Sequence, residues 1–124
     1  MTRSSFILPV AGDYLGIERR AEPRVIMSVP GTYSLSSMRD EAGRRREFVC
    51  RAINMSSRAM MLACPVKGAL GDRAIAYFRD FGKLSGRILR VLEGGLVMSL
   101  VMSEEERLRL TQRLAWMEDQ KNLD

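Results

Sequence analysis

The sequence predicts an all-β domain with one C-terminal helix, in which six short strands form an antiparallel barrel. Between residues 25 and 102, apolar or alternating runs recur at nearly even spacing and are separated by turn sequences, as is typical of small barrels. After residue 103 the apolar residues recur at helical spacing instead. A chain of 124 residues is long enough for one core but not for two. We therefore expect an N-terminal arm or edge segment at 1–17, the barrel at 18–102 and an amphipathic helix packed on it at 103–120.

The first strand is predicted at residues 25–35, where apolar and polar residues alternate. A period of two is typical of a strand with one buried face. Pro30 lies in the middle of this run and has no N–H to donate to a sheet, which predicts an edge position or a bulge there. Residues 36–45 are polar and charged and predict a connection. The run Arg44-Arg45-Arg46 is interpreted as the solvated shoulder of this hairpin.

The other five strands are predicted from shorter runs of apolar residues. They lie at residues 48–55, 60–64, 73–78, 84–92 and 96–102. The pair Gly94-Gly95 separates the last two strands, and glycine readily supplies the positive φ that a tight hairpin requires.

The helix is predicted to begin at Ser103. Glu106 follows three positions later and completes a capping box. Leu110 and Leu114 then share one face with Met117. We expect this face to pack on the barrel, although a helix at a chain end is also a common dimerisation element.

The composition favours an anionic partner. The net charge is +5 and the pI is near 9.8, mainly because arginines cluster at 19–24, 39–51 and 87–90. Such a charge suits a nucleotide, a nucleic acid or an acidic protein surface. Aromatic residues make up only 6% of the chain, which makes nucleic acid unlikely because single strands usually stack on exposed aromatic rings.

The residue types argue against an enzyme. The chain has no histidine, which excludes Ser-His-Asp and Cys-His sites and the common zinc sites. Cys50 and Cys64 are expected to be small buried apolar residues. No catalytic residue, metal site or cofactor is therefore predicted. No stretch is long enough to span a membrane, and the apolar run at 6–11 is too short for a signal peptide. A cytoplasmic location is expected.

Two polar motifs lie on either side of the first two predicted strands. The first contains Arg19, Arg20 and Arg24, and Pro23 keeps the residue before it out of the helical region. Guanidinium groups presented from an irregular segment suit phosphate oxygens or the edge of guanine. The second motif is the polar break Asn54-Met55-Ser56-Ser57-Arg58-Ala59 between two apolar runs. Asn and Ser commonly close turns through their side chains.

Together the two motifs resemble those of the PilZ domain family. Arg20-x-x-x-Arg24 matches the family's arginine motif, and Asn54-x-Ser56 matches the start of its Asp/Asn-x-Ser-x-x-Gly motif. The resemblance covers residues 18–116, nearly the whole chain. It implies a PilZ-like six-stranded antiparallel β-barrel that serves as a bacterial receptor for the second messenger cyclic di-GMP (c-di-GMP).

The resemblance also implies roles for particular residues. Arg20 and Arg24 would hold guanine and phosphate groups, and Asn54 and Ser56 would contact the other side of the ligand. Arg19 and Arg58 are further candidates for ligand contact. Binding is expected to order the arginine segment against the barrel. The changed surface would then signal to a protein partner in motility, pilus or exopolysaccharide control.

The second motif departs from the family at its end, and this leaves alternatives open. Ala59 stands where the family has glycine, and the bulky Arg58 precedes it. The change could weaken nucleotide binding or abolish it. If it abolishes binding, the chain is a degenerate PilZ-like module that binds a protein partner without nucleotide. A small basic barrel that binds nucleic acid is the third alternative.

Overall fold

A computed structural model describes residues 24–123 of the chain, and side chains up to residue 120. The strands are β1 (Val25–Arg39), β2 (Arg45–Met55), β3 (Ala59–Ala63), β4 (Arg73–Phe78), β5 (Gly82–Leu92) and β6 (Gly95–Ser99), and the helix is α1 (Glu104–Leu123). All neighbouring strands are antiparallel, and they close in the order β1-β2-β3-β6-β5-β4. The predicted all-β fold with six antiparallel strands and a C-terminal helix is confirmed. The expected arm at 1–17, Arg19 and Arg20 lie outside the described residues.

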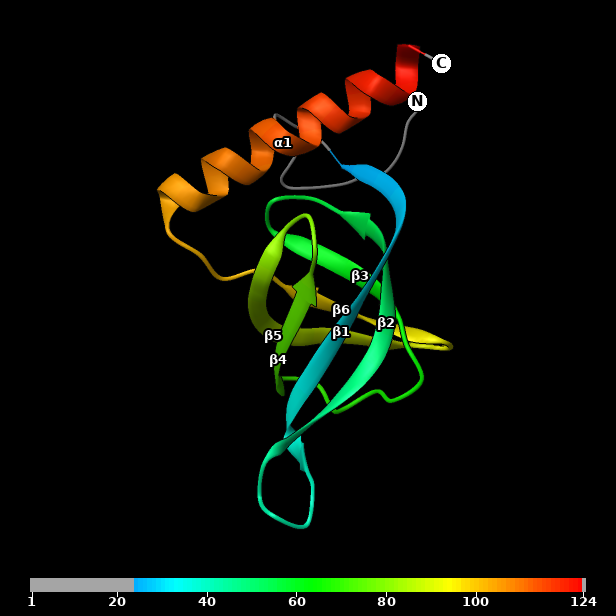
Figure 1. Cartoon of the computed structure of the whole chain (residues 1–124), viewed down its shortest axis with the longest axis vertical. Helices are drawn as coiled ribbons and strands as arrows, with labels where there is room; N and C mark the ends of the chain where they lie inside the picture. Colours follow the sequence, from blue (N-terminus) through cyan, green and yellow to red (C-terminus); the bar gives the residue numbers. More distant parts are fainter. Residues whose placement is uncertain (1–23, 124) are drawn as a thin grey trace.

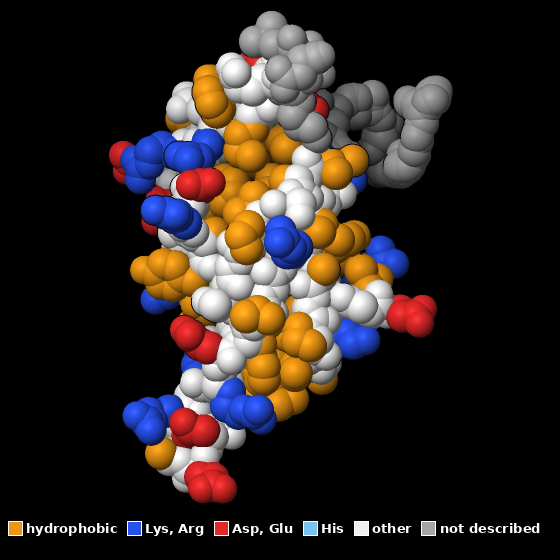
Figure 2. Space-filling model, turned by 45° about the vertical axis from the view of Figure 1, so that its right-hand side comes forward, with side chains coloured by type: hydrophobic (Ala, Val, Ile, Leu, Met, Phe, Trp, Pro, Cys, Tyr) orange, Lys and Arg blue, Asp and Glu red, His pale blue; other side chains and the backbone are white. Residues whose placement is uncertain are grey.

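The connection predicted at residues 36–45 is present but shorter than expected, since only residues 40–44 lie between the two strands. β1 and β2 continue past the barrel as a two-stranded ribbon, in which Arg39 lies opposite Arg45 (Figure 1). The turn is short because the Asp40 carboxylate accepts hydrogen bonds from the backbone N–H groups of Ala42 and Arg44, both at 2.9 Å. Acidic and basic side chains mix at this tip of the molecule (Figure 2).

The predicted effect of Pro30 on the first strand is confirmed. The ladder between β1 and β4 begins at Gly31, so Pro30 pairs only with Arg51 on β2. A register shift also lies between Ile26 and Val29, just before the proline. Gly31 is required next to it, because a Cβ there would lie 2.4 Å from the Phe78 ring.

The barrel interior is filled by apolar side chains from every strand. The largest fully buried ones include Tyr33, Phe78, Leu35, Met55, Met60, Leu62, Ile88, Leu96 and Met98. Tyr33 fits inside because its hydroxyl donates to the carbonyl of Val66 and accepts from the N–H of the same residue. Cys50 and Cys64 are buried free thiols.

The helix lies across one end of the barrel (Figure 1). The predicted capping box is present: the Ser103 N–H donates to Glu106 Oε1 at 2.9 Å, and the Glu106 N–H donates to Ser103 Oγ at 3.1 Å. Leu110 and Leu114 are buried in the same core as the barrel residues, and Met117 packs against that core. The last strand is shorter than predicted, since β6 ends at Ser99 and only an isolated bridge from Val101 to Ser85 follows.

Candidate functional site

The residues of the second motif lie at one end of a ladder that crosses four strands on the outer surface of the barrel. Asn54 on β2 lies opposite Met61 on β3, Met61 lies opposite Val97 on β6, and Val97 lies opposite Arg90 on β5. Neighbouring strands are about 4.8 Å apart, so the ladder spans about 14 Å from Asn54 to Arg90. Its middle is apolar and its two ends are polar.

Two β-bulges turn the ends of this ladder outward. Along β2 the buried positions Cys50 and Ala52 would place Asn54 inside by simple alternation, but the register shifts between Ala52 and Asn54. Along β5 the register shifts between Ile88 and Arg90 in the same way. An extra residue in one strand re-aims the side chains that follow it. The bulges therefore bring Asn54 and Arg90 to the same face.

Above the ladder lies a pocket of about 220 Å³. It is lined by Arg24, Asn54, Ser56, Ala59, Met60, Met61, Arg90 and Val97. Two arginines and no carboxylate are present among these lining residues. Guanidinium groups beside an apolar floor suit a ligand that combines an anionic group with a flat ring. The pocket is smaller than the roughly 300–1,000 Å³ typical of sites for drug-sized ligands, so it would hold one part of a larger molecule.

Ser56 closes the turn between β2 and β3. Its Oγ accepts hydrogen bonds from the N–H groups of Arg58 and Ala59, at 3.2 and 3.3 Å. Its own N–H donates to the Ala59 carbonyl at 2.9 Å. The predicted turn role of Ser56 is therefore fulfilled within the chain, and the same half-buried side chain also lines the pocket.

The two departures from the PilZ motif lie in different places. Ala59 is the first residue of β3 and pairs with Ser99, so its backbone is extended and does not require glycine. Its methyl group lines the pocket. Arg58 is exposed and is not one of the lining residues. The departure that reaches the pocket is thus one methyl group rather than an arginine side chain.

The turn that carries Ser56 also forms hydrogen bonds with the segment that joins β6 to α1 and with the helix itself. The Arg58 carbonyl accepts from the Leu100 N–H at 2.9 Å. Arg107 of α1 donates from Nη1 to the carbonyl of the fully buried Ser57 and from Nη2 to the Leu100 carbonyl. These bonds hold the turn between the end of β6 and the first turns of the helix.

The structure thus brings together Arg24, Asn54 and Ser56, while Arg58 lies outside the pocket. Arg90 was not predicted as a site residue. Its membership of the arginine cluster at 87–90 was the available signal, but strict alternation with the buried Ile88 would have turned it into the barrel. Only the register shift before it places it outside.

The cysteine thiols and the acidic side chains of the described residues lie outside the pocket that Arg24 and Asn54 line. Burial raises the pKa of the Cys50 thiol to about 12 and also raises the pKa of Cys64. Within the described range, no group of His, Cys, Asp or Glu side chains is placed to hold a metal ion. The one described helix is too polar to cross a membrane.

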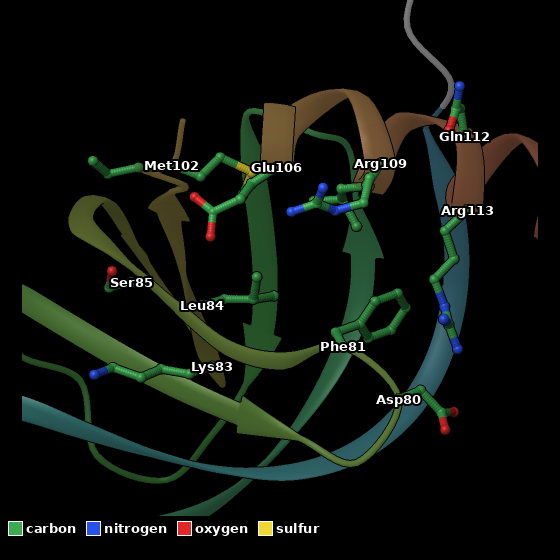
Figure 3. A pocket seen from close by; sticks show the side chains of 12 residues that line it. Asp80, Phe81, Lys83, Leu84, Ser85, Met102, Glu106, Arg109, Gln112 and Arg113 are labelled. Atoms are coloured by element: carbon green, nitrogen blue, oxygen red, sulfur yellow. The ribbon is translucent and has the colours of Figure 1, made fainter. Parts of the chain in front are cut away.

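A larger hollow, of about 820 Å³, lies between α1 and the β4–β5 hairpin (Figure 3). Glu106 extends from the helix toward Leu84 on the barrel side, and the Arg109 side chain points along the helix toward Glu106. Arg113 lies over the Phe81 ring, with 5.6 Å between Cζ and the ring centroid. None of the motif residues lines this hollow, and it contains acidic as well as basic side chains. We therefore regard the smaller pocket (the motif pocket) as the candidate ligand site.

Comparison with known proteins gives support for the fold. No protein-family model matches the chain, and no curated protein matches it. Among solved structures, the chain is similar to the K. pneumonia MrkH–c-di-GMP complex, with a TM-score of 0.58 and 11% sequence identity. The similarity covers 87% of this chain and 57% of that chain. At this identity the likeness concerns the fold, and the PilZ-like barrel with a C-terminal helix is confirmed.

Proposed function

We propose that this chain is a PilZ-type receptor that binds c-di-GMP and passes the signal to a protein partner. One observation carries the proposal: Arg24 of the first motif lines the same pocket as Asn54 and Ser56 of the second. The similar fold of a protein solved with c-di-GMP supports the proposal independently of the pocket.

The chemistry of the pocket suits one half of a cyclic dinucleotide. A guanine ring would lie on the apolar floor formed by Met61 and Val97. Arg24 or Arg90 would donate to the O6 and N7 acceptors of guanine or to a phosphate, where arginine forms bidentate pairs. In this proposal Arg19 and Arg20 contact the rest of the ligand.

The alternative of a degenerate module without nucleotide depends on Arg58 and Ala59. Arg58 does not line the pocket, and Ala59 adds one methyl group at its wall. Both observations indicate that the departures from the family motif make the pocket smaller but do not block it. We therefore rank nucleotide binding above the protein-only alternative.

Isothermal titration calorimetry of the purified protein with c-di-GMP tests the proposal. We expect micromolar or tighter binding that Arg24→Ala and Arg20→Ala each weaken at least tenfold, since a charge-assisted hydrogen bond contributes about 1.5–3 kcal/mol. Arg79→Ala is the matched control, because Arg79 is exposed and lines none of the hollows described above. GTP is the control ligand.

Two results would contradict the proposal. The absence of heat with near-millimolar c-di-GMP would favour the protein-only module, and a search for a protein partner would follow. Equal binding by the wild type and Arg24→Ala would show that the ligand does not bind in this pocket.

A further inference from the structure

A third pocket, of about 440 Å³, lies over the β4–β5 hairpin, away from the motif pocket but beside the larger hollow, with which it shares Lys83, Ser85 and Val101. It is lined by Arg45, Arg73, Ala74, Ile75, Lys83, Ser85, Gly86, Arg87 and Val101. Four of these residues are cationic, and no carboxylate lines the pocket among the described residues. None of its lining residues belongs to the motif pocket.

Two of the cations lie directly opposite each other. Arg73 on β4 and Arg87 on β5 are cross-strand partners, and both are exposed on the outer face. Like charges at such positions destabilise a sheet. Arg87 donates from Nη1 to the Gly71 carbonyl at 2.9 Å, which leaves its charge uncompensated. The nearby Asp72 carboxylate instead accepts from Ser37 Oγ and from the Ala69 N–H.

A third cation in the pocket, Arg45, has one guanidinium nitrogen without a hydrogen-bond partner among the described residues. Arg45 is half-buried, unlike its exposed neighbours Arg44 and Arg46, so the interpretation of this run as a solvated shoulder is wrong for Arg45. Its Nη1 is buried and has no hydrogen-bond partner within residues 24–123. A buried donor without a partner carries a desolvation cost. Arg45 lies on β2, which is separated from β4 by β1 in the barrel. Its side chain nevertheless lines the pocket over β4 and β5.

We propose that this basic pocket (Arg45, Arg73, Lys83 and Arg87) binds a small molecule that carries two adjacent phosphate groups. A diphosphate would offset the repulsion between Arg73 and Arg87 and would bring negative charge beside the half-buried Arg45 guanidinium. Lys83 lies four residues before Arg87 on β5, about 13 Å along the strand, and also lines the pocket. In this proposal its long side chain contacts the second phosphate.

The shape of the pocket favours a small phosphate compound over an extended polymer. Its volume lies within the roughly 300–1,000 Å³ typical of small-molecule sites. None of its lining residues is aromatic, whereas sites for single-stranded nucleic acid stack bases on aromatic rings. The exposed apolar side chains that would anchor a peptide are limited to Val101 and the half-buried Ile75.

Calorimetry with pyrophosphate as the probe, at low ionic strength, tests this site. We expect Arg73→Gln and Arg87→Gln each to weaken pyrophosphate binding at least tenfold. Arg79→Gln removes the same charge from the turn of the same hairpin and should change affinity less than twofold. Arg24→Ala should leave pyrophosphate binding unchanged, which separates this site from the proposed c-di-GMP pocket.

Thermal unfolding distinguishes a ligand site from a structural cluster. The Arg73 side chain makes no hydrogen bond or ion pair within the described part of the chain. The ligand-free Arg73→Gln variant should therefore unfold at the same or a higher temperature than the wild type, and should lose the pyrophosphate-induced rise in Tm. A fall in the ligand-free Tm with an unchanged pyrophosphate shift would overturn the proposal.

Other probes separate the remaining outcomes. A ten-residue oligothymidylate and a ten-residue glutamate peptide are titrated in parallel with pyrophosphate. If either of them binds and pyrophosphate does not, the cluster is a surface for that polymer and the proposed small-molecule site is wrong. If Arg24→Ala abolishes pyrophosphate binding, the probe occupies the motif pocket and the proposal is equally wrong.

Discussion

Among single residues, Ala59 decides how much room the motif pocket has. Its backbone is extended and its methyl group lines the pocket, so Ala59→Gly removes bulk without releasing backbone strain. We expect c-di-GMP affinity to be unchanged or higher in Ala59→Gly, and at least tenfold lower in Ala59→Leu. Ala63→Leu is the control, because Ala63 ends the same strand and does not line the pocket. Tight binding by Ala59→Leu would show that the ligand lies elsewhere.

Arg90 gives a second prediction at this scale. It lies about 14 Å from Asn54 across the ladder, where it can reach the far side of a bound ring. We expect Arg90→Ala to weaken c-di-GMP binding about tenfold, in keeping with the loss of a charge-assisted hydrogen bond. Calorimetry beside Arg79→Ala measures this effect. An Arg90→Ala variant that behaves like Arg79→Ala would limit the site to the β2 end of the ladder.

The buried thiols predict a pH dependence of stability. Burial raises the pKa of Cys50 from an ordinary 9.0 to about 12, so the unfolded chain loses this proton at a lower pH than the folded chain. Stability is therefore retained below pH 9 and falls as the pH rises from about 9 toward 12, by up to about 1.4 kcal/mol per pH unit for one group. Circular dichroism melts between pH 8 and 10.5 should show the fall. The slope should be smaller in Cys50→Ala, whatever its Tm at neutral pH.

At the scale of elements, the N-terminus of α1 depends on the capping box. Ser103 and Glu106 satisfy each other's backbone N–H groups. The hydrogen bonds that the Glu106 carboxylate accepts from the Ser103 N–H and hydroxyl hold the pKa of this carboxyl below its usual value. We expect Ser103→Ala to lower the free energy of unfolding by about 1 kcal/mol at neutral pH. The folded carboxylate is favoured above the ordinary glutamate pKa of 4.5 and is lost in more acidic solution. The difference between wild type and variant, measured by urea unfolding, should therefore shrink below about pH 4.

The strands differ in how well the sequence predicts them. The range predicted for β4 is correct, because both ends of that strand carry clear turn sequences. β1 extends past its predicted end at Leu35 because pairing with β2 continues to Arg39. Polar residues in a ribbon that extends from the barrel need not alternate with apolar ones, so their composition alone resembles a loop.

Across the whole molecule, the fold was easier to predict than the site. Alternation and turn residues report local structure, and the barrel follows from them. The site depends on register between strands far apart in the sequence, and bulges before Asn54 and Arg90 change which face these residues occupy. An extra residue in a strand leaves no composition signal. The pairing of Arg73 with Arg87 likewise becomes visible only once β4 and β5 are aligned.

Arg107 connects the turn beside the motif pocket to the C-terminal helix. The turn that carries Ser56 shares hydrogen bonds with the first turns of α1 through Arg107, so transient opening of the two segments is coupled. A ligand that holds the turn closed should slow amide hydrogen exchange in the N-terminal half of the helix, although no ligand atom touches it. Arg107→Ala should remove this remote protection while the amides near Ala59 still become protected. The helix would then be a reporter of occupancy that a second protein can read at a distance from the nucleotide.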